Sequence, residues 1–274
     1  MTELATALTI GADLPFTFFH ASDTHLTLCD QRDDARKQEL AAQRAALFPQ
    51  AELRLRESAN RARECGSFLV HTGDMIDFVS EANLEAAERF MRENRCIFTA
   101  GSHEFSRYVG EAFEDADYRA QSLDRVQTAF PLNIRFAARR LHGVNFVALD
   151  NSYFRVESWQ LSRLKAEVQR GSPVVLCMHV PLFTEKLYAY AMRFAESAGL
   201  MCVPEDLMRD YSDYRYYQQK ADAVTNAAYE YIVNCPAIRL ILSGHLHFDF
   251  ETMLTPRLTQ LVTGSDTVRR ITLR

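Results

Sequence analysis

The spacing of apolar and polar residues changes along this chain. Through the first two-thirds of the chain the changes predict strands that alternate with helices. Short apolar runs bounded by turn residues predict strands at 16–21, 67–71, 96–100, 134–141, 144–149, 173–178 and 238–242. Segments rich in Ala, Arg, Glu and Leu, or with apolar residues at helical spacing, predict helices at 35–65, 80–94, 117–129, 158–170 and before Asn234. This alternation of strands and helices is typical of an α/β fold.

Single residues mark where several of these elements begin and end. Pro49 is expected to interrupt the helix at 35–65, because proline lacks a backbone donor. Ser80 is expected to cap the helix at 80–94, and Gly171 is expected to stop the helix at 158–170. A hairpin is expected to turn at His142 and Gly143.

The last third of the chain has a different pattern. An irregular, aromatic stretch is expected at 181–216, and from Phe248 onward the residues alternate like antiparallel strands. These strands suggest a second sheet packed on the first. No repeat, low-complexity linker or block of like charge divides the sequence, so residues 1–274 are expected to form one domain.

Composition narrows the classes of protein. The 274 residues can bury a large core, and 47% hydrophobic with 24% charged residues match an ordinary soluble globular protein. A net charge of −5 argues against a general polyanion binder, so nucleic acid is not an expected partner. No window holds the roughly 18 uninterrupted apolar residues of a membrane span. The segment MTELATALTIGADL lacks a basic region and a long apolar run, so it does not resemble a signal peptide.

The cysteines point to a reducing compartment. Six of them lie 25 or more residues apart and form no C-x-x-C pair. That spacing matches neither a zinc ribbon nor a dense disulfide framework, so we interpret them as reduced thiols of a cytoplasmic protein. They are Cys29, Cys65, Cys96, Cys177, Cys202 and Cys235.

Five predicted strands end in polar clusters that carry metal-compatible side chains. Ligand sites in α/β sheets gather at the carboxyl ends of strands, and five of the eight histidines lie in these endings. Alternate side chains of a strand share a face, so Asp23 and His25 are expected to point the same way and to suit a divalent metal. The clusters are Asp23-x-His25, Gly73-Asp74, Gly101-Ser102-His103-Glu104, His179 and Gly244-His245-Leu246-His247.

Taken singly, each cluster also has an ordinary structural explanation. Asp23 could cap a turn, and a lone histidine at a strand end is often satisfied within the core. Glycine before Asp74, His103 and His245 allows a sharp turn and a close approach to an ion or phosphate. The ordered set favours a metal site, because every member comes after an apolar run and carries a ligand.

In this order the clusters resemble the signature of the calcineurin-like metallophosphoesterases, which reads D-x-H, G-D, G-N-H-[DE], H and G-H-x-H. The resemblance extends from about Phe16 to His247. It implies two packed mixed β-sheets flanked by helices, a four-layer α/β/β/α sandwich. It also implies a hydrolase with two divalent metal ions, for which manganese, iron or zinc is expected.

The resemblance assigns roles residue by residue. Asp74 resembles the carboxylate that bridges both metals, which suits a group with two oxygens to share. The remaining histidines and aspartate resemble ligands of one metal each. Those of the first metal are Asp23, His25 and His247, and those of the second are His179 and His245.

The cluster around His103 carries the remaining roles and one departure. His103 resembles the histidine that contacts the phosphoryl group and helps the leaving oxygen depart, with Glu104 as its orienting partner. Ser102 stands where the family usually has asparagine, whose carbonyl oxygen binds the second metal. Since serine is a shorter and weaker neutral ligand, either water fills the gap or the second site binds its metal more loosely.

The activity that the resemblance implies is hydrolysis of a phosphomonoester or phosphodiester by attack of a metal-bound hydroxide, with no protein nucleophile. The expected partner is a small phosphate ester. A 3',5'-cyclic-nucleotide phosphodiesterase is the alternative within the family, and a non-catalytic metal-binding scaffold is the alternative from another class. The presence of His103 argues against the scaffold. A nuclease ranks last, because residues 183–220 carry five basic and six acidic residues and offer no phosphate track.

Other polar residues near the clusters are interpreted as structural. His20 and His71 precede the aspartates of the first two clusters by three residues, which tends to place them on the opposite face of each strand. His142 is interpreted as a turn residue and Cys177 as a core residue. Asp77 could hydrogen-bond a metal ligand or start a turn.

Residues 181–217 form an aromatic-rich insertion between two ligand-bearing elements. Tyrosine offers a flat stacking surface and a hydroxyl, which suits recognition of a nucleobase or aryl group. The insertion is therefore a candidate substrate cap, and a helical subdomain that buries its aromatic residues is the alternative. Six of the eleven tyrosines lie here: Tyr188, Tyr190, Tyr211, Tyr214, Tyr216 and Tyr217.

Overall fold

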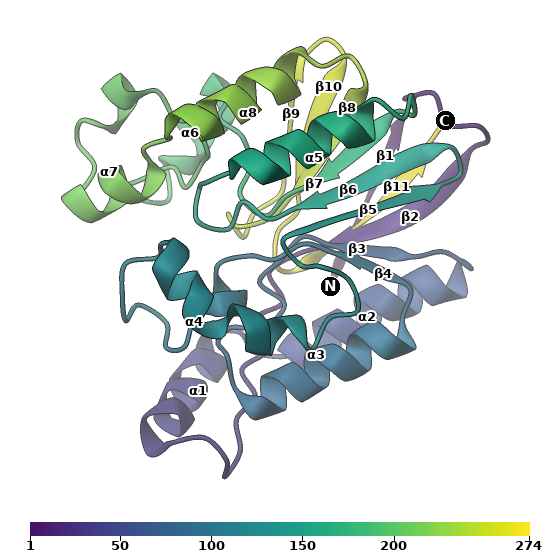
Figure 1. Ribbon diagram of the computed structural model, residues 1–274. Helices are drawn as coiled ribbons and strands as arrows, with labels where there is room; N and C mark the ends of the chain where they lie inside the picture. The colour runs from purple at the N-terminus through teal and green to yellow at the C-terminus, as the bar shows by residue number, and fades with distance from the viewer.

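The computed structural model describes residues 1–274, and its framework is a pair of β-sheets packed face to face (Figure 1). One sheet has the strand order β1 (Thr2–Leu8), β11 (Thr267–Leu273), β2 (Phe16–Ala21), β3 (Leu69–His71) and β4 (Cys96–Phe98). The other has the order β5 (Phe136–Leu141), β6 (Val144–Leu149), β7 (Val174–Cys177), β8 (Ile238–Ser243), β10 (Leu258–Val262) and β9 (Phe250–Thr255). Both sheets are mixed. The strands β2, β3 and β4 are parallel in the first sheet, and β6, β7, β8 and β10 are parallel in the second.

The layer between the sheets is an apolar core to which both contribute. Phe18 of β2 and Phe146 of β6 meet edge to face with ring centroids 5.2 Å apart, and Phe68 stacks on Phe18 at 5.4 Å. Val175 and Leu240 of the six-stranded sheet belong to the same buried cluster. This core fixes how the two sheets sit against each other, because close-packed interiors tolerate little displacement.

Helices cover the outer face of each sheet. Phe19 points away from the inner layer, as strand alternation requires, and joins a buried cluster with α2 (Ala51–Glu64), α3 (Glu81–Glu93) and α4 (Ala116–Gln127). The outer face of the six-stranded sheet packs against α5 (Ser158–Val168) and α8 (Ala223–Asn234). The four-layer α/β/β/α arrangement is therefore confirmed.

Most predicted boundaries agree with the structure. The first helical segment is interrupted at Pro49 and gives α1 (Ala35–Leu47) and α2. Ser80 caps α3 by accepting a hydrogen bond from the Asn83 backbone N–H at 3.1 Å. The hairpin turns at His142 and Gly143.

The second sheet that the C-terminal strands suggested is present, but these strands are divided between the two sheets. β9 and β10 extend the six-stranded sheet, whereas β11 inserts between β1 and β2 of the other sheet. Alternation of apolar residues predicts that a segment is a strand, but the strand's partner is set by long-range pairing that the pattern does not encode.

β1 is a strand that the sequence did not indicate. Its sequence TELATAL mixes threonine, which favours strands, with alanine and glutamate, which do not, and it is the edge strand of its sheet with much of its surface exposed. It forms because it pairs in parallel along its whole length with β11, from Thr2 opposite Thr267 to Leu8 opposite Leu273.

The insertion is more regular than expected. It contains α6 (Glu185–Ala191), the short 3₁₀ helix η2 (Glu205–Met208) and α7 (Asp213–Gln219). Helices this short are marginal alone, and packing stabilises them: Leu187, Leu200 and Met208 form a buried cluster that includes Val262 of β10. In Figure 1 the insertion lies on the left, on the same side of the sheets as α1 and α4.

Two further expectations concern the surface and the thiols. All six cysteines are free.

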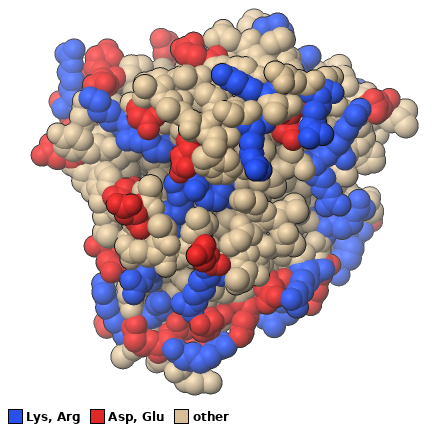
Figure 2. Space-filling model, viewed as in Figure 1, with Lys and Arg blue, Asp and Glu red and all other residues tan.

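None of the helices combines the length and apolar character needed to cross a bilayer. Acidic and basic side chains are interspersed along the lower edge of the face in Figure 2, where α2 and α3 lie, so this edge offers no uninterrupted basic surface.

Candidate metal centre

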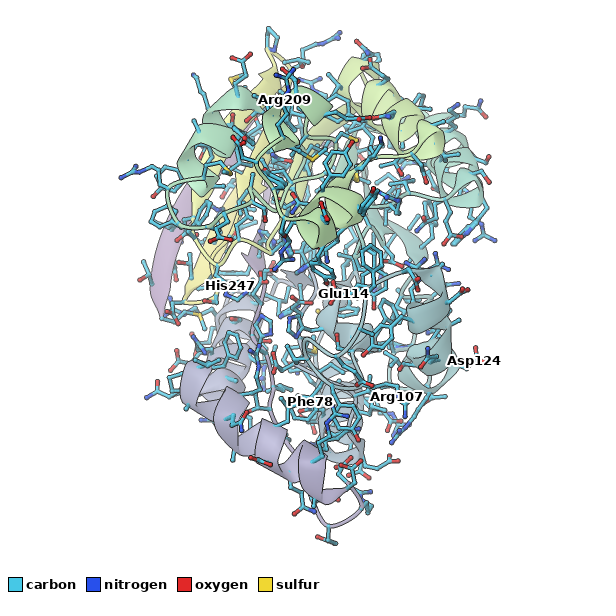
Figure 3. The ribbon with its side chains drawn as sticks, turned by 90° about the vertical axis from the view of Figure 1, so that its left-hand side faces the viewer. Phe78, Arg107, Glu114, Asp124, Arg209 and His247 are labelled. Atoms are coloured by element: carbon cyan, nitrogen blue, oxygen red, sulfur yellow. The ribbon has the colours of Figure 1, made fainter.

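The predicted polar clusters meet at one edge of the paired sheets. Asp23, Asp74 and His103 come after β2, β3 and β4, and His179 and His245 come after β7 and β8. These strands run parallel within each sheet, so their carboxyl ends share an edge. The edge belongs to the face shown in Figure 3, where His247 and Glu114 lie between the insertion above, marked by Arg209, and Arg107 below.

The first cluster consists of Asp23, His25 and His247, whose ligand atoms lie within 4.8 Å of one another. The Nε2 atoms of the two histidines are 3.1 Å apart. The Asp23 Oδ1 atom is 3.4 Å from the His247 Nε2 and 3.9 Å from the His25 Nε2. The three predicted ligands of the first metal therefore converge on one point.

The second cluster consists of Asp74, His179 and His245. The Asp74 Oδ2 atom is 3.1 Å from the His179 Nε2, and that nitrogen is 3.2 Å from the His245 Nδ1. Asp74 Oδ2 also lies 3.8 Å from the His25 Nε2 of the first cluster. Asp74 thus stands between the clusters, where a shared carboxylate would have to stand.

The spacing of the ring nitrogens fits co-ligands of one cation. Imidazole nitrogens that share a tetrahedral ion at about 2.0–2.1 Å lie roughly 3.3 Å apart. The two histidine pairs, His25 with His247 and His179 with His245, have 3.1 Å and 3.2 Å between their facing nitrogens. Borderline divalent ions prefer such mixed imidazole and carboxylate sets, so the residues present fit two of them.

The backbone at these positions is unusual. Five non-glycine residues of the clusters have positive φ angles between 50° and 68°: Asp23, His25, Asp74, His245 and His247. Non-glycine residues pay of order 1–3 kcal/mol for this conformation, which persists where the surrounding structure enforces it. Asp23 and His25 lie beyond the end of β2, so they converge through this left-handed geometry and not, as the sequence suggested, through the period of a strand.

The glycines before the clusters are required by close packing. A Cβ atom on Gly101 would overlap the Asp74 carboxylate, and a Cβ atom on Gly244 would overlap the Ser22 hydroxyl and the Asp23 carboxylate. At Gly73, whose φ is +93°, a Cβ atom would overlap the Gly101 backbone. Glycine therefore lets four loops, those after β2, β3, β4 and β8, approach one another closely at the site, as its role before the clusters predicted.

Hydrogen bonds hold the ring orientations of two candidate ligands. Asp77 Oδ1 contacts the His25 Nδ1 at 2.8 Å, and the Thr72 carbonyl oxygen contacts the His179 Nδ1 at 2.8 Å. Asn151, whose role the sequence left open, accepts hydrogen bonds from the His179 and Val180 backbone N–H groups, both at 3.0 Å. Such partners fix which ring nitrogen faces the ion, and replacing them typically costs 10- to 100-fold in affinity or activity.

The charges of the site shift the pKa values of its members. Burial would raise the pKa of Asp74, but the neighbouring histidines outweigh burial and hold it well below the usual range. Burial lowers the pKa of His245 to about 3, so this imidazole is neutral. At His179 the Asp74 charge and hydrogen bond outweigh burial and raise the pKa to about 9. A cation must displace that proton, so its binding strengthens as the pH rises.

His103 lies at the rim of the clusters, with 18% of its side chain exposed. Its Nδ1 is 2.8 Å from the Asp77 carbonyl oxygen and 3.1 Å from the Asp77 Oδ1, which leaves Nε2 free. Burial would lower its pKa, but the Asp74 charge and the Asp77 hydrogen bond outweigh burial and raise it to about 10. The ligand atoms of His103, Asp74 and His25 lie within 4.8 Å of one another, so the His103 ring stands beside both clusters.

Glu104 does not contact the His103 ring, so its expected orienting role is wrong. Its Oε2 accepts hydrogen bonds from the Asp74 and Gly101 backbone N–H groups at 2.8 and 2.6 Å. Its Oε1 accepts from Met75 at 2.7 Å and Ile76 at 3.2 Å. Glu104 thus connects the Asp74 loop to the loop after β4 through hydrogen bonds. The residue that contacts the His103 ring is Asp77.

Replacing Glu104 with glutamine should therefore destabilise the fold. The amide has one acceptor oxygen, so two buried backbone N–H groups lose their acceptor, at a cost of at least about 2 kcal/mol. The expected melting temperature is about 4–8 °C below wild type, measured by calorimetry with Glu88→Gln on the surface of α3 as control. An unchanged melting temperature with a large loss of turnover would restore the orienting role.

Ser102 is the residue before η1 (His103–Phe105), at the end of the loop that follows β4. Its side chain is buried, at 5% exposure, and its backbone carbonyl accepts hydrogen bonds from Phe105 and Ser106. The hydroxyl makes no hydrogen bond within the chain and is free to serve as a donor or ligand.

The sequence did not indicate that α1 covers the first cluster. Phe48, at the end of α1, stacks on the His25 ring with centroids 4.0 Å apart. Arg44 binds the Asp77 carboxylate through its Nε at 2.6 Å and its Nη2 at 2.8 Å. No sequence motif indicated that these residues belong to the site, because they reach it only when the helix docks on the sheet.

The histidines interpreted as structural lie outside the clusters. His20 is hydrogen-bonded to Thr72 at 2.8 Å and to Thr263 at 2.9 Å, and His71 is hydrogen-bonded to Thr24 at 3.2 Å. Both are fully buried. Cys177 lies in the core between the sheets, and His142 stacks on Phe16 at the hairpin turn.

The tyrosines of the insertion divide into two groups. Tyr211 is buried and its hydroxyl accepts a hydrogen bond from Ala198, and Tyr188 and Tyr216 bond within the insertion. Tyr214 and Tyr217 are 41% and 62% exposed. The structural alternative thus describes the first group, and the second group has the rings most accessible to a substrate.

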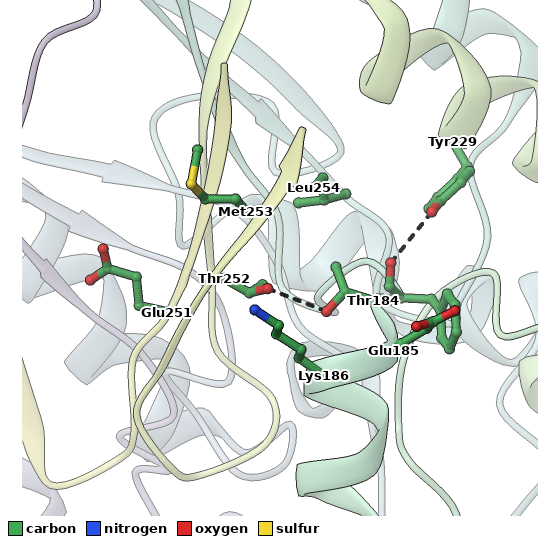
Figure 4. A pocket seen from close by; sticks show the side chains of 9 residues that line it. Thr184, Glu185, Lys186, Tyr229, Glu251, Thr252, Met253 and Leu254 are labelled. Carbon is green, nitrogen blue, oxygen red and sulfur yellow. Dashed lines mark hydrogen bonds between the residues drawn. The ribbon is translucent and has the colours of Figure 1, made fainter. Parts of the chain in front are cut away.

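Another groove of the molecule is separate from these clusters. It has a volume of about 610 Å³ and lies between the start of α6, α8 and the edge strand β9 (Figure 4). Thr184 and Thr252 face each other across it at 3.5 Å, and Tyr229 donates a hydrogen bond to the Phe183 carbonyl oxygen at 3.4 Å. None of its lining residues is a candidate metal ligand.

Comparisons with known proteins show the family and the fold of the chain. The sequence profile of calcineurin-like phosphoesterases matches residues 16–249. A search of curated protein sequences finds no match.

Two solved structures share the fold. A dimetal phosphatase of Danio rerio is 12% identical, with 91% of this chain and 88% of that chain covered and a TM-score of 0.51. A Staphylococcus aureus protein assigned as a 5'-nucleotidase, in complex with alpha-ketoglutarate, is 14% identical, with 94% of this chain covered and a TM-score of 0.50. The chain spans 51% of that protein's length. Identities this low show a common fold alone.

Proposed function

The chain belongs to the calcineurin-like phosphoesterase family, and we propose that it is a hydrolase that uses two divalent metal ions to cleave a phosphomonoester or phosphodiester bond. The observation that carries the proposal is the arrangement around Asp74. This carboxylate lies 3.1 Å from His179 of one cluster and 3.8 Å from His25 of the other. His103 stands at the rim of both.

The metal-binding roles derive from the two clusters. Asp74 would be shared, and each cluster would hold one ion of manganese, iron or zinc, which imidazole and carboxylate ligands suit. Divalent ions in such a pair supply an activated water and neutralise charge on the phosphoryl group. The ligands of the first ion would be Asp23, His25 and His247, and those of the second His179 and His245, with Ser102 nearby.

His103 would act on the substrate directly. Its Nε2 has no partner within the chain, and the hydrogen bond with Asp77 raises the pKa of the imidazole, so Nε2 would donate a hydrogen bond to a phosphoryl oxygen or a proton to the leaving oxygen. Asp77 holds the ring through Nδ1, and the Arg44 guanidinium keeps Asp77 ionised beside it. The chain therefore supplies the acid and its orientation.

A metal-dependent activity screen tests the proposal. Protein stripped with a chelator is reloaded with manganese, iron or zinc and assayed on an aryl phosphomonoester, an aryl phosphodiester and 3',5'-cyclic nucleotides. Turnover that appears only with metal supports a phosphohydrolase and identifies the bond. Full metal occupancy without turnover on any of these esters would instead favour a metal-binding scaffold.

Ser102 offers a test of the second ion. Serine supplies a shorter arm than the asparagine usual in the family, so the second ion is expected to bind more weakly than the first. Ser102→Asn should tighten it, because an amide oxygen can then join His179 and His245. Metal titration of both proteins, monitored by stoichiometry and activity, measures the change. Two equally tight ions in the wild type, with no gain in the variant, would show that the serine causes no weakness.

A further inference from the structure

A pocket of about 460 Å³ lies between α7 of the insertion and the segments after η1 and β6. It contains no candidate metal ligand and no residue assigned to catalysis. Six of its lining residues carry the argument: Phe113, Glu114, Tyr153, Arg155, Tyr217 and Gln218.

Aromatic contacts connect the pocket to the metal centre. Tyr153, in its wall, packs against Phe105 of η1 with ring centroids 6.2 Å apart, and η1 begins at His103. The next residue, Phe154, lies edge-on against the candidate ligand His245 at 5.4 Å. The wall of the pocket is therefore packed directly against the wall of the metal centre.

The insertion closes the pocket on its outer side. Gln218 of α7 donates a hydrogen bond to the Glu114 carboxylate at 3.0 Å, and Tyr214 packs edge-on against Phe113 at 5.4 Å. In Figure 3 Glu114 lies at the centre of the face, below the insertion. The segment after His103 and the insertion thus form one continuous wall.

This wall presents two exposed aromatic rings. Phe113 is 41% exposed and Tyr217 is 62% exposed. A flat aromatic ligand can stack on such rings, and stacking on an aromatic side chain is a major source of affinity for nucleobases.

One buried polar group in the pocket lacks a partner. Tyr153 is only 3% exposed, and its hydroxyl has no hydrogen-bond partner. An unpaired buried hydroxyl is costly, and a plain hydrocarbon ring would leave it unpaired. A ligand with ring nitrogens or exocyclic groups would satisfy it, so the pocket favours a heteroaromatic group.

The charges of the pocket exclude a second phosphate. Arg119 is bound by Asp150 at 3.1 Å and Glu157 at 2.8 Å, and Arg155 lies 3.8 Å from Asp222. No unpaired cation remains to bind a further anionic group. The Glu114 carboxylate instead offers an acceptor for an N–H donor.

We propose that this pocket receives the nucleobase of a nucleoside phosphate with a single phosphoryl group. The inference rests on the proposed phosphohydrolase function and adds the class of substrate. The base stacks on Phe113 and Tyr217, the Tyr153 hydroxyl and the Glu114 carboxylate bind its polar edge, and the phosphoryl group reaches His103 and the metal clusters.

Paired substrates test the proposal. Metal-loaded wild type and Tyr217→Ala are assayed on adenosine monophosphate and on glycerol phosphate, which has no ring. Tyr217→Ala should lower kcat/KM for the nucleotide about five- to 100-fold, the effect of one lost base–aromatic stack, and leave glycerol phosphate within about twofold. Tyr217→Phe should retain nucleotide turnover, because it keeps the ring.

Phe194→Ala is the matched control, since Phe194 is 63% exposed in the same insertion and does not line the pocket. This variant should leave kcat/KM unchanged for both substrates. The proposal would be overturned if Phe194→Ala lowered kcat/KM for the nucleotide alone. It would also be overturned if Tyr217→Ala lowered kcat/KM equally for both substrates.

Binding separates this inference from the proposed function. Adenosine, which has no phosphate, should bind the wild type in calorimetry and bind Tyr217→Ala about five- to 100-fold more weakly. That result supports the pocket even if no ester is hydrolysed. Hydrolysis of glycerol phosphate without any binding of adenosine would uphold the phosphohydrolase and reject the nucleobase pocket.

Discussion

Replacing Asp74 with asparagine is expected to abolish turnover and to lower the metal content of both sites. Asp74 is the one carboxylate that lies between the clusters, 3.1 Å from His179 and 3.8 Å from His25. Asparagine keeps the shape but removes the charge and one oxygen acceptor. The paired cations contribute several kcal/mol to stabilising the transition state, and each 1.4 kcal/mol is tenfold, so the loss should exceed about 100-fold.

Metal stoichiometry by elemental analysis and kcat on the best ester of the screen measure the effect of Asp74→Asn. Asp124→Asn, on the exposed face of α4, is the control and should match the wild type in both. An Asp74→Asn protein that keeps two ions and its turnover would contradict the bridging assignment. Loss of only one ion would show that Asp74 serves a single site.

Replacing His103 with alanine is expected to leave the metals in place and to reduce kcat by about 10²–10⁴-fold, the usual contribution of a general acid or base. The prediction rests on the ring's position at the rim and on its hydrogen bonds to Asp77, which leave only Nε2 to face the substrate. The backbone N–H of residue 103 donates to the Asp74 Oδ1 at 2.9 Å, and alanine preserves that bond.

The metal content of His103→Ala decides its role. Two ions bound at wild-type affinity, together with the loss of kcat, support an acid that touches the phosphoryl group. Loss of an ion would instead make His103 a ligand. A substrate with a leaving group of low pKa needs little protonation, so it should recover part of the lost rate if His103 donates the proton.

The candidate ligands could be predicted because they lie in short sequence motifs whose residue types and order are recognisable. Apolar runs locate the strands, and parallel strands in one sheet bring the residues at their carboxyl ends to one edge. The reason offered for Asp23 and His25 was nevertheless wrong, because both residues have left-handed backbone and lie beyond the strand. Propensity does not predict positive φ at such residues, since the surrounding packing imposes it.

The partners of the site could not be predicted in the same way. Asp77 contacts His103 across 26 residues, and Phe48 stacks on His25 only after α1 docks. Glu104 is the next residue after His103, yet its carboxylate turns to the backbone of the Asp74 loop. Sequence neighbours share a segment, but contacts of this kind depend on how segments meet in three dimensions.

The pairing of the first strand with the last has a consequence for how the protein matures on the ribosome. β1 has no partner other than β11, and β11 also forms one side of β2. The five-stranded sheet therefore stays incomplete until residues 267–273 have been translated. Chains grow at about 5–20 residues per second, so residues 2–8 wait tens of seconds or less for their partner. His245 and His247 are made long after Asp23 and Asp74, and a nascent chain therefore acquires both metal clusters only after residue 247 has been translated.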